Sequence, residues 1–257
     1  MPLPSGIHSL GTPFIELQSV DSTNNYALAQ IHAKLAQPGT CYFAHEQTSG
    51  KGQRGKTWAT ERGMNIIISI VLRPDFLQPI QQFQLSACVA VATHQFLNKY
   101  DGSSLKIKWP NDIYWQDRKL GGILIENVVR SRESASASWD WAVVGVGINI
   151  NQASFADDLK NPVSLKQVTG ESFDQIELAR KLCSSIDHFY KKLMNNETNA
   201  ILEMYNQLLY KKDETVKLKK NNRIFSCIIK EVSLTGQLVV QHSVEEQFDF
   251  GEIEWLI

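Results

Sequence analysis

The sequence predicts an α+β protein in which a mixed or antiparallel sheet with flanking helices is followed by a small β module. Up to about residue 210, β-branched runs alternate with segments of helical periodicity. Beyond that point only short strand-like runs separated by turn residues follow. The chain has 257 residues, 43 % of them hydrophobic, enough for one large core and an appendage. We therefore expect a first domain over residues 1–211 and a second over residues 212–257.

The elements of the first domain follow from hydrophobic periodicity and from helix start and stop signals. Strands are expected over residues 14–18, 41–47, 64–73, 105–109, 112–115, 120–129 and 139–150. Helices are expected from the cap residues at 21–23 to about residue 35, from Pro79 onward, over 174–194 and over 198–210. The long helix after Pro79 carries an apolar stripe that indicates core: Leu85, Cys88, Ala92 and Phe96.

Two further expectations concern the strands near residue 140. The small polar stretch 131–138 is interpreted as a mobile hairpin tip. The strand 139–150 is interpreted as exposed, so its edge is a candidate for pairing two copies of the chain. Monomer and homodimer therefore both stay open.

The second domain is predicted from four short apolar runs over residues 216–218, 224–229, 238–240 and 248–250. Turn signals separate them at Asn221-Asn222 and Thr235-Gly236. Regular spacing of short strands is typical of compact β folds, so a barrel of about five strands is expected.

Composition excludes several classes of function. The 26 basic and 27 acidic residues give a net charge of −1, which offers no broad footprint for nucleic acid or an anionic membrane. The four cysteines lack C-x-x-C spacing and the six histidines lack metal-ligand spacing, which favours reduced thiols over disulfides or zinc. No Ser-His-Asp arrangement is evident. Without a signal peptide or a long apolar span, the protein is expected in the cytoplasm.

Residues 50–57 fit the phosphate-binding pattern G-x-x-x-x-G-K-[ST], but their context does not. A P-loop must open a helix. Here Gly63 and the β-branched run 66–72 follow instead. We therefore interpret the segment as a flexible glycine loop whose cations, Lys51, Arg54 and Lys56, close over an anionic ligand. A P-loop nucleotidase survives only if a helix follows Thr57.

A second cluster, residues 108–112, places Asn111 and Asp112 directly after Pro110. Asp112 has the chemistry to hold Mg²⁺, which accepts one or two carboxylates together with water and phosphate. An ordinary turn explains the same residue types. From these residues alone both readings stay open.

Glycines near two strands suggest open space for a ligand. Lys119 precedes Gly121 and Gly122, so it is either an exposed turn lysine or a ligand-binding cation. Gly145 and Gly147 alternate along an apolar strand. Such a bare face suits a flat ring system, or alternatively close packing against the long helix.

Taken in order, these segments resemble the biotin protein ligases, of the monofunctional type without a DNA-binding domain. The matching motifs are residues 21–24, 46–58, 108–113, 119–126 and 145–149. The resemblance implies the catalytic fold of that family, which is like that of class II aminoacyl-tRNA synthetases, and an SH3-like barrel at the carboxyl end. No winged helix-turn-helix fits before Phe14, so a dedicated enzyme without DNA binding is expected.

The resemblance implies a two-step reaction. The biotin carboxylate attacks the α-phosphate of ATP to give biotinyl-5′-AMP, and a lysine of a biotin carboxyl carrier protein, the biotinyl domain of a carboxylase, then takes the biotinyl group. Lys119 would touch both the carboxylate and the α-phosphate. Arg54, Lys56 and Mg²⁺ would supply positive charge where charge develops. Asp112 would coordinate Mg²⁺ or help to deprotonate the incoming lysine, and this choice stays open.

The resemblance also implies the binding residues. For biotin they are Ser22, Thr23, Gln47, Gly50, Lys51, Gly121, Gly122, Gly145 and Gly147. For ATP and the adenylate they are Gly52, Gln53, Arg54, Gly55, Lys56, Trp58, Asn111, Lys119 and Asn149. Trp58 would cover the ligand or only anchor the loop.

One departure and two alternatives remain. Many relatives have a loop of the form G-R-G-R-x-G, whereas this chain has Lys51 and Gln53, so bidentate clamping is reduced to Arg54 and looser adenylate retention is expected. A lipoate ligase shares the broader fold and the lysine-acylating logic. A non-catalytic vitamin-binding module would keep the pocket without turnover.

Overall fold

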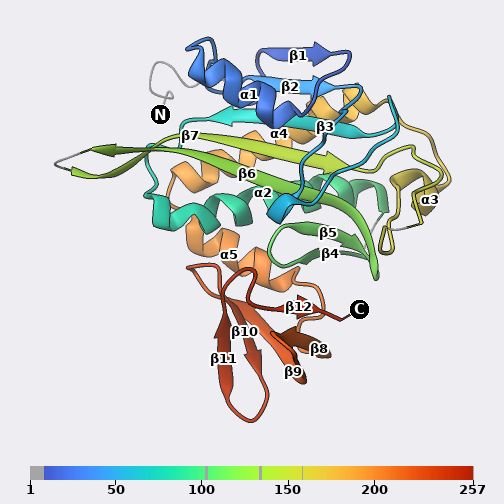
Figure 1. Ribbon diagram of the computed structural model, residues 1–257, viewed down its shortest axis with the longest axis vertical. Helices are drawn as coiled ribbons and strands as arrows, with labels where there is room; N and C mark the ends of the chain where they lie inside the picture. Colours follow the sequence, from blue (N-terminus) through green and yellow to red (C-terminus); the bar gives the residue numbers. More distant parts are fainter. Residues whose placement is uncertain (1–8, 102–103, 133–134, 158, 257) are drawn as a thin grey trace.

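The structure is a computed structural model that describes residues 9–101, 104–132, 135–157 and 159–256. Its first sheet has seven strands in the spatial order β1-β2-β3-β7-β6-β5-β4 (Figure 1). The strands are β1 (Phe14–Leu17), β2 (Cys41–Ala44), β3 (Ile66–Leu72), β4 (Leu105–Lys108), β5 (Asp112–Trp115), β6 (Arg118–Arg132) and β7 (Ala135–Ile148). β1 and β2 pair in parallel, and the other neighbours are antiparallel. The predicted mixed sheet is confirmed.

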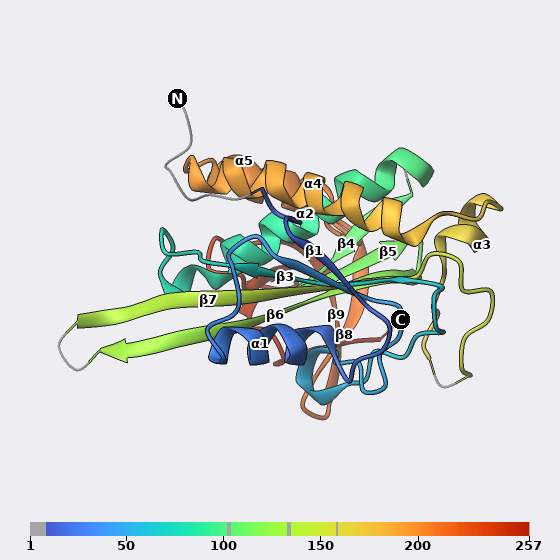
Figure 2. The same cartoon turned by 90° about the horizontal axis from the view of Figure 1, so that it is seen from above.

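Helices cover both faces of this sheet, unequally (Figure 2). On one face lies α1 (Thr23–His32), which packs on β3 and β7. On the other lie α2 (Gln82–Asp101), α4 (Gln175–Met194) and α5 (Thr198–Gln207), with α2 against both α4 and α5. The short helices are η1 (Gln53–Gly55), η2 (Pro79–Gln81) and α3 (Leu165–Thr169).

The predicted long helix is confirmed as α2, and its apolar stripe lies in the hydrophobic core. Leu85, Cys88, Ala92 and Phe96 are all buried between α2 and its neighbours. The first helix is shorter than expected: it ends at His32, and Leu35 beyond it is exposed. Helix α3 was not predicted.

The strands β6 and β7 form a long hairpin that extends past the body of the molecule (Figures 1 and 2). The expected hairpin tip over 131–138 is wrong in extent, because β6 continues to Arg132 and β7 begins at Ala135. Residues 133–134 lie outside the described residues. The expectation that residues 139–150 form an exposed edge is also wrong for most of the strand, since residues 142–148 pair with both β3 and β6.

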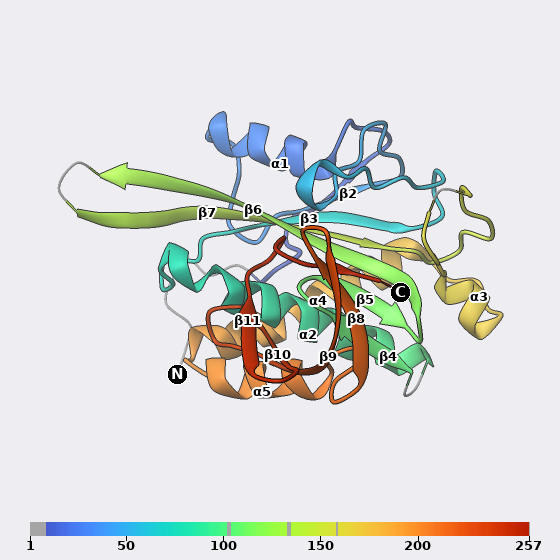
Figure 3. The same cartoon turned by 60° about the horizontal axis from the view of Figure 1, so that its bottom comes forward.

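The second sheet has five antiparallel strands in the order β11-β10-β9-β8-β12. They are β8 (Thr215–Lys220), β9 (Arg223–Val232), β10 (Leu238–Gln241), β11 (Glu245–Phe248) and β12 (Glu254–Trp255). The five strands predicted from turn spacing are therefore present. This sheet packs below the first domain, where β9 contacts α5 (Figures 1 and 3).

We propose residues 211–212 as the domain boundary. The backbone N–H of Tyr210 still bonds to Ile107 of β4, whereas that of Asp213 bonds to Ile229 of β9. All four cysteines are free and buried. None of the helices in the described part of the chain is long and apolar enough to cross a bilayer.

Candidate active site

A cavity of about 1000 Å³ opens between the first sheet, the glycine loop and the second domain. Its walls come from the start of α1, residues 51–59, the ends of β4 to β7, Phe155, residues 159–162 and residues 250–255. Most of the site residues predicted from sequence line it. These are Ser22, Thr23, Gln47, Lys51, Gly52, Gln53, Arg54, Lys56, Trp58, Asn111, Asp112, Lys119, Gly122, Gly145, Gly147 and Asn149. Gly50, Gly55 and Gly121 do not line the cavity but adjoin residues that do.

The glycine loop is not a P-loop, because the element that follows Thr57 is the strand β3 and not a helix. The loop folds back on itself: Lys51 forms a bridge with Thr57, and the N–H of Gly52 donates to the carbonyl of Lys56 at 2.6 Å. At its tip Arg54 has a φ of 55°, a conformation that few non-glycine residues adopt. The P-loop nucleotidase reading is therefore rejected.

Lys119 and Asp112 meet inside the cavity, with Nζ 2.8 Å from Oδ1. They lie on neighbouring strands, β6 and β5, whose register shifts between Ile113 and Tyr114. This bulge leaves Leu120 unpaired and buried, and a bulge redirects the side chains beside it. The Lys119 ammonium also lies 5.5 Å from the centre of the Trp58 ring. Lys119 is thus a partly exposed cation, 31 % accessible, at the cavity wall.

Lys108 adds a second, more buried ammonium to the same wall. Its Nζ donates to the Tyr114 hydroxyl at 3.1 Å and lies over the rings of Tyr114 and Trp255, at 4.6 and 5.5 Å. Burial lowers the pKa of Lys108 to about 8, with the neighbouring cation Lys119 also lowering it and Asp112 opposing. Burial first, and the neighbouring cations second, therefore make the charged form of Lys108 less favourable at this wall.

Two of the predicted glycines accommodate protein side chains in this structure. A Cβ at Gly145 would overlap the Asn24 amide, and one at Gly147 would overlap the Trp58 indole. The alternative prediction, that these glycines allow close packing against the long helix, is therefore wrong. The side chains that pack against them come from α1 and the glycine loop. At Gly121 a Cβ would crowd the carbonyl of Gly147 on β7.

Arg54 connects the glycine loop to the second domain. Its Nη1 donates to the carbonyl of Gly251 at 3.1 Å, in the segment between β11 and β12. Gly251 has a φ of 93°, and a Cβ there would contact the guanidinium. The arginine thus lines the cavity while one of its donors holds the carboxyl-terminal segment.

The start of α1 supplies polar groups at the opposite wall. The N–H and the hydroxyl of Thr23 both approach Gln47 Oε1, at 2.8 and 3.1 Å. Ser22 occupies the N-cap position without a side-chain cap bond, so its hydroxyl is not used by the helix. The predicted amides Asn111 and Asn149 line the cavity and also bond to the carbonyls of Ile123 and Val163.

Sequence reasoning assigned no role to several residues that the fold brings to this cavity. Asn24 belongs to the motif at residues 21–24. A polar asparagine within the first turn of a helix was the sequence feature that could have identified it as a site residue. Lys108 likewise sits in a noted motif. Phe250 and Trp255 come from the second domain, and nothing in their local sequence indicates that they meet a cavity more than 100 residues upstream.

The fold and cavity define an α+β protein with a cationic pocket between its two sheets. The family model described as the biotin/lipoate A/B protein ligase family matches residues 16–149, which is more than half of the chain. The chain belongs to this family.

Curated relatives are longer. The chain is 33 % identical over 183 residues to the bifunctional ligase/repressor BirA of Bacillus spizizenii, covering 70 % of this chain and 54 % of that protein. It is 35 % identical over 119 residues to BirA of Escherichia coli, covering 46 % of this chain and 36 % of that protein. The chain thus matches about a third to a half of the length of these two relatives.

A solved structure shows the same fold. The biotin protein ligase from Aquifex aeolicus in complex with biotin and ATP superposes with a TM-score of 0.77 at 24 % identity. The match covers 93 % of this chain and 97 % of that one. The predicted fold class, a biotin ligase fold with a five-stranded carboxyl-terminal sheet, is confirmed.

Proposed function

We propose that the protein is a biotin protein ligase, which activates biotin with ATP as biotinyl-5′-AMP with release of pyrophosphate, and then transfers the biotinyl group to a lysine of a carrier protein with release of AMP. The observation that carries the proposal is Lys119 beside Asp112, in the wall of a cavity that the loop cations Lys51, Arg54 and Lys56 also line. The Aquifex protein of the same fold binds biotin and ATP, which supports this choice of substrates.

In the first step two anions must approach each other. Lys119, Lys56 and Lys108 line one cavity, so positive charge is already in place where the carboxylate meets the α-phosphate. Such preorganised charge stabilises a transition state without reorganisation during the reaction. Lys119 would release Asp112 in part as the anions arrive, because its ammonium has three donors.

In the second step a carrier lysine attacks the mixed anhydride. Asp112, which lines the cavity beside Lys119, would accept a proton from that amine or alternatively hold the metal. Trp58 over Gly147 and the glycine loop would keep water from the anhydride, which hydrolyses readily.

A magnesium ion is proposed to accompany ATP. Among the described residues, no group of three or more His, Cys, Asp or Glu side chains is arranged to hold a metal ion. The protein side chains there do not form a complete metal site by themselves. Mg²⁺ needs only one or two carboxylates when phosphate and water complete its shell, and Asp112 fits that role. Bound there, it would neutralise phosphate charge.

The carrier is proposed to be the biotinyl domain of a carboxylase, and the site of action the cytoplasm. The four free, buried cysteines suit a reducing compartment. The net charge of −1 does not favour nucleic acid or membrane partners. Monomer and homodimer both remain compatible with the fold.

The test uses purified protein, biotin, ATP, Mg²⁺ and a biotinyl carrier domain. The expected result is a mass increase of one biotinyl group on a single carrier lysine. Lys119→Ala should abolish this mass increase. The control Lys181→Ala removes the same positive charge from the exposed face of α4 and should not affect it. Ligation by Lys119→Ala at the wild-type rate would remove Lys119 from the mechanism, and biotin binding by the wild type without any ligation would favour the non-catalytic binding module.

A lipoate ligase is the second candidate, because the matched family includes lipoate enzymes. The same assay with lipoate and a lipoyl carrier domain distinguishes the two. Acylation by lipoate but not by biotin would replace the proposed function.

A further inference from the structure

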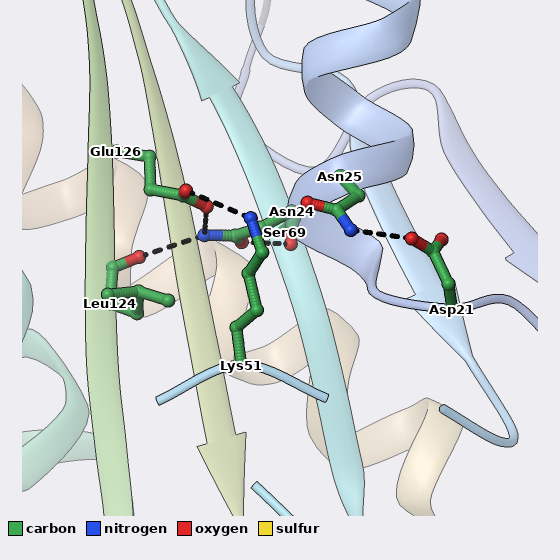
Figure 4. Close-up of polar contacts among 7 residues, drawn as sticks. All are labelled: Asp21, Asn24, Asn25, Lys51, Ser69, Leu124 and Glu126. Atoms are coloured by element: carbon green, nitrogen blue, oxygen red, sulfur yellow. Dashed lines mark hydrogen bonds and ion pairs between the residues drawn. The ribbon is translucent and has the colours of Figure 1, made fainter. Parts of the chain in front are cut away.

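Glu126 on β6 does not line the cavity, yet it connects two of the groups that do (Figure 4). Its Oε2 accepts a hydrogen bond from Asn24 Nδ2 at 2.8 Å, and its Oε1 lies 3.3 Å from Lys51 Nζ. Asn24 comes from α1 and Lys51 from the glycine loop. One carboxylate thus holds elements that are separated by 26 residues in the chain.

The Glu126 carboxylate, together with the more distant carbonyl of Leu124 at 3.4 Å, fixes the orientation of the Asn24 amide. An ionised carboxylate only accepts hydrogen bonds, so the NH₂ group of Asn24 must face Glu126. The amide oxygen then faces Ser69 Oγ, which lies 2.6 Å away. Asn24 is 3 % exposed, and Gly145 provides the space it occupies, so the amide has no solvent to turn toward.

The amide oxygen in turn fixes the Ser69 hydroxyl. Ser69 is fully buried on β3 and has one proton, which the Asn24 oxygen requires because that oxygen can only accept. The Ser69 and Thr23 hydroxyl oxygens are 2.8 Å apart. With the Ser69 proton committed to Asn24, this contact needs the proton of Thr23.

The hydrogen-bond chain ends at Gln47 in the cavity wall, where too few hydroxyl protons remain for every contact. The backbone N–H of Thr23 donates to Gln47 Oε1 at 2.8 Å, which fixes the Gln47 amide. The Thr23 hydroxyl lies 3.1 Å from the same oxygen, the longest of the three contacts. Two hydroxyl protons therefore serve three contacts. When the Thr23 hydroxyl donates to Ser69 instead of to Gln47 Oε1, the Thr23 and Gln47 oxygens are both left as acceptors at the cavity.

We propose that Glu126 is a positioning residue that sets the direction of this hydrogen-bond chain and thereby makes the site select ligands with ring N–H donors. The inference rests on the proposed function, since biotin presents such N–H groups at its ureido ring. An N–H directed at Thr23 and Gln47 supplies the missing proton. A site built for a donor strongly rejects an analogue that lacks it, because buried acceptors then remain unpaired.

The test compares Glu126→Gln with wild type by calorimetric binding of biotin and of biotin methylated at a ring nitrogen. A glutamine offers Asn24 either an oxygen or an NH₂ group, so only the longer contact to the Leu124 carbonyl, at 3.4 Å, then favours the original amide orientation. The expected result is that the ratio of the two dissociation constants falls about tenfold or more. Glu177→Gln, the same change on the exposed face of α4, should leave the ratio unchanged.

Ser69→Ala provides a second variant that interrupts the chain without touching Lys51. It should lower the same ratio, and the double variant with Glu126→Gln should be no worse than either alone, because both act through one chain. Circular dichroism verifies that each variant is folded. A folded Glu126→Gln protein that keeps the wild-type ratio overturns the inference and leaves the proposed function intact. Absence of biotin binding by the wild type overturns both.

Discussion

Arg54 and Gly251 lie 197 residues apart in the chain, yet the arginine donates a hydrogen bond to the glycine carbonyl at 3.1 Å. The contact closes the cavity from the side of the second domain, because residues 250–255 form part of the same wall as the glycine loop. The carboxyl-terminal sheet therefore belongs to the site and is not only an appendage.

The pair Lys119 and Asp112 gives the first prediction. Lys119→Ala should reduce adenylate formation by about 100-fold or more, because it removes charge aimed at the reacting centre. Asp112→Asn should also slow the reaction while leaving biotin affinity nearly unchanged, since its role lies with the metal or the incoming amine. Single-turnover kinetics of biotinyl-AMP formation, with biotin affinity measured separately, checks both. Equal loss of biotin affinity and rate in Asp112→Asn would speak against this assignment.

Trp58 and Gly147 give the second prediction. Gly147→Ala places a methyl group where the indole lies, so the indole must move and the glycine loop with it. We expect a shift of tryptophan fluorescence and faster hydrolysis of the adenylate. The control is Ser184→Ala on the exposed face of α4. A second glycine, Gly170, is unsuitable because its positive φ would strain an alanine. Unchanged adenylate lifetime in Gly147→Ala would contradict a covering role for Trp58.

Lys108 gives a prediction on pH. Its pKa is lowered by burial to about 8, so between about pH 8 and its ordinary range near 10.5 the unfolded chain binds this proton and the folded one does not. Stability rises with pH wherever the unfolded state binds more protons. The free energy of unfolding of wild type relative to Lys108→Met should therefore rise from pH 8 to pH 10. Urea unfolding of both proteins at several pH values measures it, and a flat difference would refute the lowered pKa.

Gln53 gives the fourth prediction. Its side-chain Oε1 is buried and has no hydrogen-bond partner among the described residues. We expect the wild type to release biotinyl-AMP measurably or to biotinylate itself. Gln53→Arg should retain the adenylate longer, because a guanidinium bonds phosphate in a bidentate manner. Chromatography of released adenylate over many turnovers checks this, and complete retention by the wild type would contradict it.

The sequence predicted most of the fold because its signals are local. Pro79 and the stripe Leu85, Cys88, Ala92 and Phe96 sufficed for α2, and turn spacing sufficed for the second sheet. Pairing is not local, which explains the error at residues 139–150: whether a strand is an edge depends on β3, more than 70 residues upstream. Helix α3 was missed because five residues give too little periodicity.

The site was predictable where one motif contains the whole interaction. Asp112 and Lys119 lie on adjacent strands of one short hairpin, so their sequence proximity becomes spatial proximity. Residues that meet only through the fold were not assigned, as with Glu126 beside Asn24 and Trp255 beside Lys108. The glycines at 145 and 147 were noticed for a ligand, whereas the structure fills their space with Asn24 and Trp58.

The most direct measurement is exchange of labelled pyrophosphate into ATP, driven by the candidate acids without any carrier. The account predicts rapid exchange with biotin, none with lipoate, and loss of exchange in Lys119→Ala. Exchange that needs no biotin, or that persists undiminished without the Lys119 ammonium, would contradict the central claim that this cationic cavity joins biotin to a nucleotide.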